Sequence, residues 1–256
     1  METAVLSSGS KGNSVLIKTK NTKILIDLGI TKSYAIEKLS ELNVDPNEIK
    51  AILITHTHTD HIQGLKTFLK TYKPILYVNK TIKQILDEYV VYDNYYIYEN
   101  DSFTIDDVDV TVIKTSHDAK GSVGFVLKNE NKSMVYITDT GYVNERYFDI
   151  LKNHNLYIME SNHDPEMLIN GRYPYHLKRR IRSDKGHLSN EQSAEYLSMF
   201  IGDKTKTIVL AHLSDDNNTY EKALDTLNAV LENNNKKVKN IIIAKQKQRT
   251  DMIKLW

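Results

Sequence analysis

His56-Thr57-His58-Thr59-Asp60-His61 is a run of six residues, four of which are of metal-ligand type, and it directly follows an apolar stretch, residues 51–55. We interpret that stretch as a buried β-strand. In extended backbone, alternate side chains share one side, so His56 and His58 can face the same metal ion. Asp60 and His61 fall where the next helix begins and point elsewhere, so they can serve a second ion. A polar loop at a helix start would not need three imidazoles.

Three more candidate ligands stand shortly after apolar segments later in the chain: His117, Asp139 and His212. Loops at such strand ends carry function on a rigid scaffold. A zinc-type site needs more ligands than one loop can supply, and open catalytic sites keep a position for water. Each of the three residues alone would more often be an ordinary loop residue. Together, after the histidine run, they predict a metal centre.

Short apolar runs with β-branched residues alternate with helical spacing along most of the chain. Each half begins with hairpins and continues with strand–helix alternation, which predicts two packed sheets with helices on their outer faces. The expected fold is an α/β, four-layer αββα sandwich, and no linker divides residues 1–256, so we expect a single domain. Among the expected elements are a strand over residues 23–27, one helix over residues 62–72 and another over residues 220–231.

The composition is that of an ordinary globular protein: 256 residues, 40% hydrophobic and 26% charged. The absence of cysteine excludes disulfides, zinc ribbons and thiol nucleophiles, and it fits a reducing compartment. Neither a signal-peptide pattern nor an apolar run of about 18 residues is present, so we expect a cytoplasmic protein without a transmembrane helix. A net charge of +1 gives no hint of the partner.

The order of the candidate ligands resembles the metallo-β-lactamase superfamily, whose pattern is a histidine-rich loop, a lone His, a lone Asp and a final His, each after a strand. The resemblance begins at Leu25-Ile26-Asp27-Leu28-Gly29 and ends at His212. It implies that Asp139 bridges two ions and that Asp27 supports the histidine loop from behind. A plain turn residue before Gly29 is the alternative interpretation of Asp27. The two implied ligand sets are His56, His58 and His117 for one ion, and Asp60, His61 and His212 for the other.

Two ions about 3.5–4 Å apart would activate a bridging water and stabilise the attacking and leaving oxygens together. Such a site needs no Ser or Cys nucleophile. The Asp139 bridge resembles the hydrolase and nuclease branches of the superfamily rather than true β-lactamases. Imidazole ligands suit Zn²⁺, while carboxylates also admit Mn²⁺ or Fe²⁺, so the identity of the two ions stays open.

A second motif, Gly186-His187-Leu188-Ser189, precedes an expected helix. Ser189 with Gln192 predicts a capping box, which accounts for the serine but not for His187. The stretch resembles the Gly-His-x-Ser/Thr motif of tRNA 3′-processing endonucleases, in which the His is paired with a Glu and donates a proton to the leaving oxygen. The resemblance implies that His187 is a catalytic acid with Glu160 as its partner. Asp60 is the third residue that we expect to be catalytic. A general acid contributes typically ~10²–10⁴-fold.

Residues 7–14, 160–164 and 183–190 together look closest to the YycJ/WalJ/VicX family. These are small cytoplasmic proteins described as 5′-to-3′ exonucleases on double-stranded DNA, so the resemblance implies DNA as the partner. His163 lies in the second of these stretches, and we expect it to support the site or to start a helix. The oligomeric state stays open.

Two segments are candidates for phosphate contacts. The backbone of the turn over residues 7–14 could cradle a phosphate at Ser10, Gly12 and Asn13, although a plain hairpin turn explains it equally well. A basic run just before His187 could contact the DNA backbone, and a solvated helix face is its alternative. The run consists of Lys178, Arg179, Arg180, Arg182 and Lys185.

These features predict a two-metal phosphodiesterase that cleaves DNA from 5′ ends. A small-molecule hydrolase of the same fold, acting on thioesters or lactones, is the alternative, because it would need neither His187 with Glu160 nor a basic rim. A non-enzymatic accessory role would have to explain a full ligand set with open positions.

Overall fold

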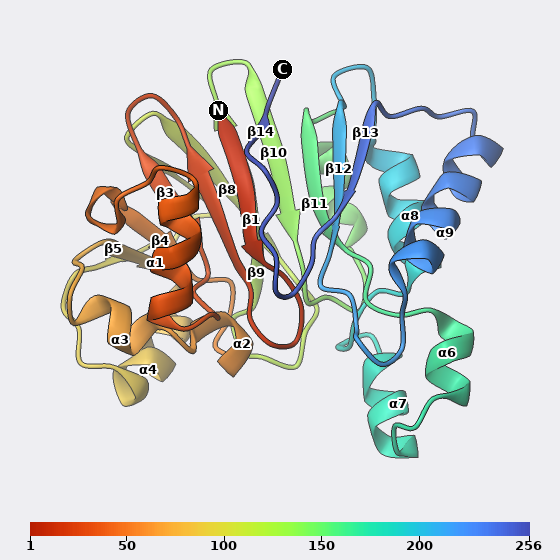
Figure 1. Ribbon diagram of the computed structural model, residues 1–256, viewed down its shortest axis with the longest axis horizontal. Helices are drawn as coiled ribbons and strands as arrows, with labels where there is room; N and C mark the ends of the chain where they lie inside the picture. Colours follow the sequence, from red (N-terminus) through yellow and green to blue (C-terminus); the bar gives the residue numbers. More distant parts are fainter.

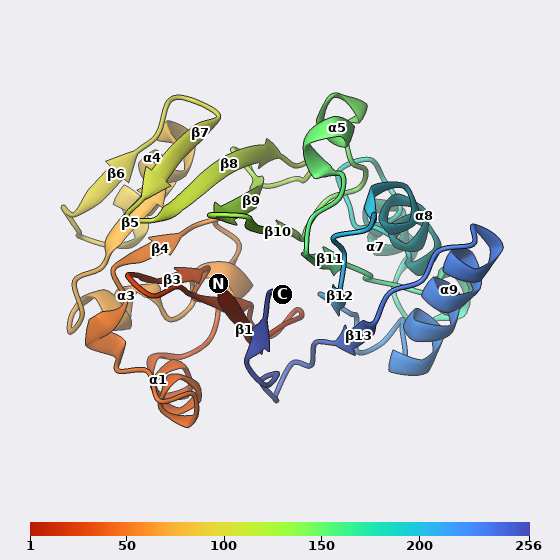
Figure 2. The same cartoon turned by 90° about the horizontal axis from the view of Figure 1, so that it is seen from above.

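The computed structural model describes residues 1–256 and contains two seven-stranded sheets packed face to face, with helices on the outside (Figures 1 and 2). The first sheet has the order β14-β1-β2-β3-β4-β5-β6, and the second has the order β13-β12-β11-β10-β9-β8-β7. The strands of the first sheet are β1 (Glu2–Ser7), β2 (Ser14–Lys18), β3 (Lys23–Ile26), β4 (Ala51–Leu53), β5 (Ile75–Val78), β6 (Tyr95–Ile97) and β14 (Ile253–Lys254). Those of the second are β7 (Ser102–Ile105), β8 (Val108–Lys114), β9 (Val123–Asn129), β10 (Lys132–Ile137), β11 (Leu156–Glu160), β12 (Thr207–Ala211) and β13 (Asn240–Ile243).

The helices form the two outer layers, so the expected αββα sandwich is confirmed. Those between strands of the first sheet are α1 (Lys32–Glu41), α2 (Thr59–Ile62), α3 (Leu65–Leu69) and α4 (Lys80–Tyr89). Those in the second half are α5 (Phe148–Leu151), α6 (Pro165–Asn170), α7 (Tyr175–Ile181), α8 (Asn190–Phe200) and α9 (Tyr220–Asn233). None of the helices combines the length and the apolar character that crossing a membrane requires.

Alternation along the strands produces the layers, because successive side chains of a strand point to opposite faces. In β2, Val15 and Ile17 belong to the core between the two sheets, whereas Leu16 packs under the outer helices. The outer core of the first sheet takes Leu39 from α1 and Phe68 from α3. Burial of both faces holds the strand ends, and therefore the loops that follow them, in fixed positions.

Two details differ from the sequence-based expectation. The single helix expected over residues 62–72 is two short helices, α2 and α3, with a break at Gly64. A Cβ at Gly64 would lie 2.0 Å from the carbonyl oxygen of Ile30, so this residue is fixed by a distant loop and not by local helical spacing. The strands β7 and β14 and the helix α6 were not expected. That residues 1–256 form one domain stays a prediction.

The two sheets repeat one strand pattern. In the first, β1, β2 and β3 are antiparallel, and β3, β4, β5 and β6 are parallel. In the second, β8, β9 and β10 are antiparallel, and β10, β11, β12 and β13 are parallel. A further antiparallel strand flanks each, β14 beside β1 and β7 beside β8. The correspondence matches β3 with β10 and β4 with β11.

Candidate metal centre

The predicted ligands come from loops of both sheets and meet at one place. His56 and His58 follow β4, and Asp60 and His61 lie in α2. The remaining ligands follow strands of the second sheet: His117 after β8, Asp139 after β10 and His212 after β12. The centre therefore depends on the packing of the two sheets against each other.

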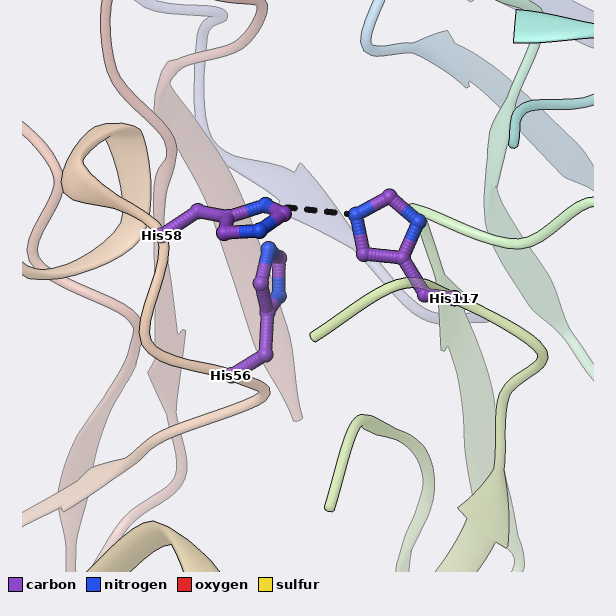
Figure 3. A group of neighbouring side chains, drawn as sticks. All are labelled: His56, His58 and His117. Atoms are coloured by element: carbon purple, nitrogen blue, oxygen red, sulfur yellow. Dashed lines mark hydrogen bonds between the residues drawn. The ribbon is translucent and has the colours of Figure 1, made fainter. Parts of the chain in front are cut away.

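One group of side chains consists of His56, His58 and His117, whose rings converge (Figure 3). The Nδ1 atom of His58 lies 3.3 Å from the Nε2 atom of His117. One nitrogen from each of the three rings lies within 4.8 Å of the others. Three imidazoles at this spacing could hold one divalent cation.

A second group consists of Asp60, His61 and His212, again with ligand atoms within 4.8 Å of one another. The Nε2 atom of His61 and the Nε2 atom of His212 each lie 3.5 Å from Oδ2 of Asp60. The two groups together contain six of the seven predicted ligands.

Asp139, the seventh, lies between the two groups. Its Oδ2 atom is 3.2 Å from Nε2 of His61, and its Oδ1 atom is 3.5 Å from Nε2 of His212 and 3.8 Å from Nε2 of His117. It also shares a ligand group with His56 and His61. Asp139 is thus within reach of both sets, as a bridging carboxylate would be.

Two buried atoms in this cluster are left without hydrogen bonds: Nε2 of His56 and Oδ2 of Asp139. A buried polar atom without a partner costs about 1–3 kcal/mol, so such atoms need an explanation. A divalent cation would satisfy both, and nitrogen and carboxylate oxygen are the donors that Zn²⁺ and Mn²⁺ accept. The residues present therefore fit a divalent metal.

Three side chains of the cluster have shifted pKa values that affect how it would bind a metal cation. Burial acts to raise the pKa of Asp139, but the imidazoles of His212 and His61 hold it well below the usual range. Burial acts to lower the pKa of His61, but the carboxylates of Asp139 and Asp27 raise it to about 10. Burial also lowers the pKa of His56 well below its ordinary value, which keeps that imidazole neutral. A metal ion entering here would displace a proton from His61, because a ligand nitrogen must be unprotonated.

Asp27 supports the histidine loop from behind, in the position that the sequence implied for it. Its carboxylate is fully buried and accepts hydrogen bonds from the Thr55 amide at 2.8 Å and the Thr55 hydroxyl at 2.7 Å. Its Oδ2 atom lies 2.7 Å from Nδ1 of His61, which directs the other ring nitrogen of His61 towards Asp139. No sequence pattern points to Thr55, whose contact with Asp27 is formed only when β3 and β4 pair.

The turn over residues 7–14 is used differently from the expected phosphate cradle. The Nδ2 atom of Asn13 lies 3.0 Å from Nε2 of His61 and 3.2 Å from Oδ2 of Asp60, so Asn13 touches two candidate ligands. The Gly12 amide donates to a carbonyl within the turn itself. Of the three residues expected to bind phosphate, Ser10 alone is exposed.

His187 and Glu160 form the pair that the sequence implied. The Nδ1 atom of His187 lies 2.7 Å from Oε1 of Glu160, and Nδ1 of His212 lies 3.0 Å from the same oxygen. The backbone amides of Thr140 and Leu188 donate to Oε2 of Glu160, each at 3.1 Å. Burial acts to raise the pKa of Glu160, but His187 lowers it to about 2. A fixed carboxylate therefore orients one predicted acid and one predicted ligand.

His163 is buried close to this pair but joins none of the predicted ligands by a hydrogen bond. Its backbone forms a bridge with Ser189. Burial lowers the pKa of the His163 imidazole to about 4. Its support of the site stays a prediction.

Arg180 of the basic run forms an ion pair with Asp118, which lies next to the first ligand group. Its Nε atom lies 2.5 Å from Oδ2 of Asp118, whose Oδ1 atom is 3.4 Å from Nε2 of both His58 and His117. Asp118 is thus a further carboxylate at the first ligand group, which the sequence analysis missed although it directly follows His117. Its charge pairs with Arg180, so Arg180 is not a free cation for phosphate.

The other members of the run are distributed around α7. Lys178 donates to the carbonyl oxygen of Ile169 at 2.7 Å, which ties α7 to α6. Arg179, Arg182 and Lys185 are exposed and form no ion pair. They remain available for an anionic partner.

The chain is similar to several known proteins. A family model described as the beta-lactamase superfamily domain matches residues 22–213. The chain is 40% identical over 235 residues to exodeoxyribonuclease YycJ of Bacillus anthracis, covering 90% of this chain and 88% of that protein. It is 39% identical over 230 residues to exodeoxyribonuclease WalJ of Streptococcus pneumoniae, covering 88% of this chain and 86% of that protein. The crystal structure of the metallo-beta-lactamase fold protein YhfI of Bacillus subtilis aligns with 97% of this chain and 98% of its own, with a TM-score of 0.71 at 16% identity.

Proposed function

Because this chain belongs to the metallo-β-lactamase superfamily and, within it, to the family of the YycJ and WalJ exodeoxyribonucleases, we propose that it is a metal-dependent exonuclease on double-stranded DNA. The two relatives supply the exodeoxyribonuclease activity by name. The family resemblance adds the 5′-to-3′ polarity and the duplex substrate. A cytoplasmic location would suit such a substrate and a chain without cysteine.

The observation that carries this proposal is the position of His187 beside both ligand groups. The ring centre of His187 lies 5.1 Å from that of His117 and 5.4 Å from that of His212. A phosphodiester held by the ligand groups would therefore have a proton donor beside its leaving oxygen. Hydrolysis of thioesters or lactones does not call for such a buried His–Glu pair.

Seven residues would hold two divalent ions, either Zn²⁺ or Mn²⁺, with Fe²⁺ also compatible with the donor set. The ions would supply a water molecule of lowered pKa and neutralise charge on the phosphate oxygens. Asp139 would bridge the ions, and Asp60 would belong to both the ligand and the catalytic groups. The ligands of only one ion would be His56, His58 and His117 for the first, and Asp60, His61 and His212 for the second.

Glu160 prepares His187 for proton transfer. The carboxylate accepts from Nδ1 of His187, which leaves Nε2 as the nitrogen that can carry the proton for the leaving oxygen. The two backbone amides on Oε2 fix the carboxylate, so the ring cannot turn away.

The test is nucleotide release from 5′-phosphorylated duplex DNA by the purified protein with Mn²⁺. EDTA and His187→Ala are the negative controls, and His154→Gln is a matched histidine change outside the centre. We expect release that depends on metal, is lost in His187→Ala and persists in His154→Gln.

Two results would contradict the proposal. Undiminished release by His187→Ala would remove the proton-donor role. No release from any nucleic acid, combined with hydrolysis of a thioester or lactone, would favour the small-molecule hydrolase.

A further inference from the structure

The helices α6 and α7 project beyond the two sheets, at the same end of the molecule as the loops that form the metal centre (Figure 1). They lie in the segment between β11, which ends at Glu160, and α8, which begins at Asn190. Their packing against the body runs through Arg180 and Asp118, next to the first ligand group. The projection therefore stands beside the centre and is fixed to it.

One face of α7 carries an aromatic ring and three cations. Lys178 and Arg179 lie three and four residues after Tyr175, and Arg182 lies four and three residues after them, so these side chains share one face. Arg180 lies on a different face, the one that contacts Asp118. The cationic face, which we call the α7 stripe, is therefore turned away from the metal ligands.

The α7 stripe lines a surface hollow of about 450 Å³ together with Ile169 of α6. The hollow has no acidic residue in its wall. Tyr175 is 77% exposed and Ile169 is 51% exposed, which leaves an aromatic and an aliphatic surface uncovered next to positive charge.

No cation of the hollow forms an ion pair with a carboxylate, unlike many cations elsewhere on the surface. Lys11, Lys23 and Lys50 each pair with a carboxylate, whereas Arg179 and Arg182 form no ion pair. The larger cleft beside His117, about 810 Å³, has three acidic residues among its lysines and is less suited to a polyanion. Unpaired cations beside an exposed aromatic ring are the combination that binds single-stranded nucleic acid, through phosphates and base stacking.

We propose that the α7 stripe holds an unpaired strand of the DNA, and that Tyr175 stacks on one of its bases. This inference rests on the proposed exonuclease function. Removal of nucleotides from a 5′ end leaves the complementary strand unpaired next to the centre, so the product of the reaction itself supplies such a strand. The stripe faces away from the ligands, which suits the strand that is not being cut. A base inside a duplex is covered on both sides and cannot stack on Tyr175, so the hollow selects unpaired nucleotides.

The test measures DNA binding by fluorescence anisotropy in EDTA, which prevents cleavage. One labelled duplex carries a 3′ single-stranded overhang, and the other is closed at both ends by non-nucleotide linkers, so that it contains no unpaired base. The variants are Tyr175→Ala, Tyr175→Phe and the pair Arg179→Ala with Arg182→Ala. Tyr220→Ala, which removes another exposed tyrosine, and the pair Lys237→Ala with Lys239→Ala are the matched controls.

We expect Tyr175→Ala to weaken binding of the overhang DNA about tenfold, within the range for loss of one stacked base, and Tyr175→Phe to restore it. Binding of the closed duplex should change little in either variant. The double arginine variant should reduce the salt dependence of overhang binding by about two phosphate contacts, and the lysine pair should not.

Equal affinity of Tyr175→Ala and the unmodified protein for the overhang DNA would overturn the stacking. The same loss on both DNAs would overturn the preference for an unpaired strand. Nucleotide release with Mn²⁺ is measured separately in the same variants. Overhang binding through the stripe without any release would contradict the proposed exonuclease, and release with unaltered binding in the variants would contradict the stripe.

Discussion

Asp27 in the first half of the molecule and Asp139 in the second stand at equivalent places, each just after the strand where its sheet changes from antiparallel to parallel. Both have left-handed backbone, with φ of 59° and 56°. Both are followed two residues later by glycine: Gly29 and Gly141. The two halves thus use one backbone device at the same point of their sheets.

The two glycines allow another part of the backbone to approach each of these turns closely. A Cβ at Gly29 would lie 1.6 Å from the carbonyl oxygen of Asp60, and one at Gly141 would lie 2.3 Å from that of Asp184. Each turn therefore has the backbone of another loop directly against it. In the first half that loop carries ligands, and in the second it leads to His187.

The side chains differ in what their neighbours supply. Both carboxylate oxygens of Asp27 are occupied by Thr55 and His61, so Asp27 can only support. Oδ2 of Asp139 makes no hydrogen bond, so Asp139 can bind an ion. The same backbone position can thus hold either an aspartate that orients a ligand histidine or an aspartate that is itself a candidate ligand. Which of the two it holds depends on whether neighbouring residues donate hydrogen bonds to both carboxylate oxygens.

The largest expected effect is on the second-half aspartate. Asp139→Ala removes the one carboxylate that reaches both ligand groups, so we expect nuclease activity to fall to the level measured in EDTA. Metal content per chain, measured by elemental analysis, should fall with it. Native activity and metal content in this variant would refute the bridging role.

His187, which lies in the second half between β11 and α8, should come next. We expect His187→Gln to lower the rate of nucleotide release ~10²–10⁴-fold, because the leaving oxygen loses its proton donor. Its metal content should stay unchanged, unlike that of Asp139→Ala. A matching loss of metal would instead make His187 a ligand.

A smaller effect is expected of the first-half aspartate. Asp27→Asn removes the charge that holds Nδ1 of His61, which should weaken metal binding ~10–100-fold. Excess metal should then restore activity in Asp27→Asn but not in Asp139→Ala, as titration of each variant with Mn²⁺ will show. If excess metal rescued both or neither, the two aspartates would have the same function.

The smallest effect is that of a change of one pH unit. With its pKa raised to about 10, His61 holds a proton at neutral pH and must release it when Nε2 binds an ion. Metal affinity should therefore rise with pH and fall as pH is lowered, about tenfold per pH unit for each proton displaced. Competition with a chelator between about pH 6 and 9 measures the slope. His154→Gln, a change far from the ligands, should leave the slope as it is, and a flat profile would contradict the charge assigned to His61.

The same contrast explains how much could be predicted from the sequence. The histidine loop is a local pattern, because His56, His58, Asp60 and His61 are neighbours in the chain. His117, Asp139 and His212 could be found because each follows a strand, and the structure brings all of these side chains together.

What sequence could not provide were contacts between separate loops. Asp118 faces His58 only because the sheets pack, and Arg180 is paired only because α7 folds back on that loop. Asn13 was expected to bind phosphate but contacts Asp60, since the turn after β1 lies under α2. The break at Gly64 likewise depends on Ile30, far away in the chain.

The first sheet can be completed only after β14 has been synthesised. This strand pairs with β1, with Thr3 opposite Ile253, and the Thr250 amide donates to the carbonyl of Val5. At synthesis rates of about 5–20 residues per second, roughly 12 to 50 s pass between translation of β1 and that of β14. During this time the nascent chain exposes an unpaired edge of β1, a site for premature association with other chains. Strand β1 thus pairs with β2 early, but its other edge is among the last to find a partner.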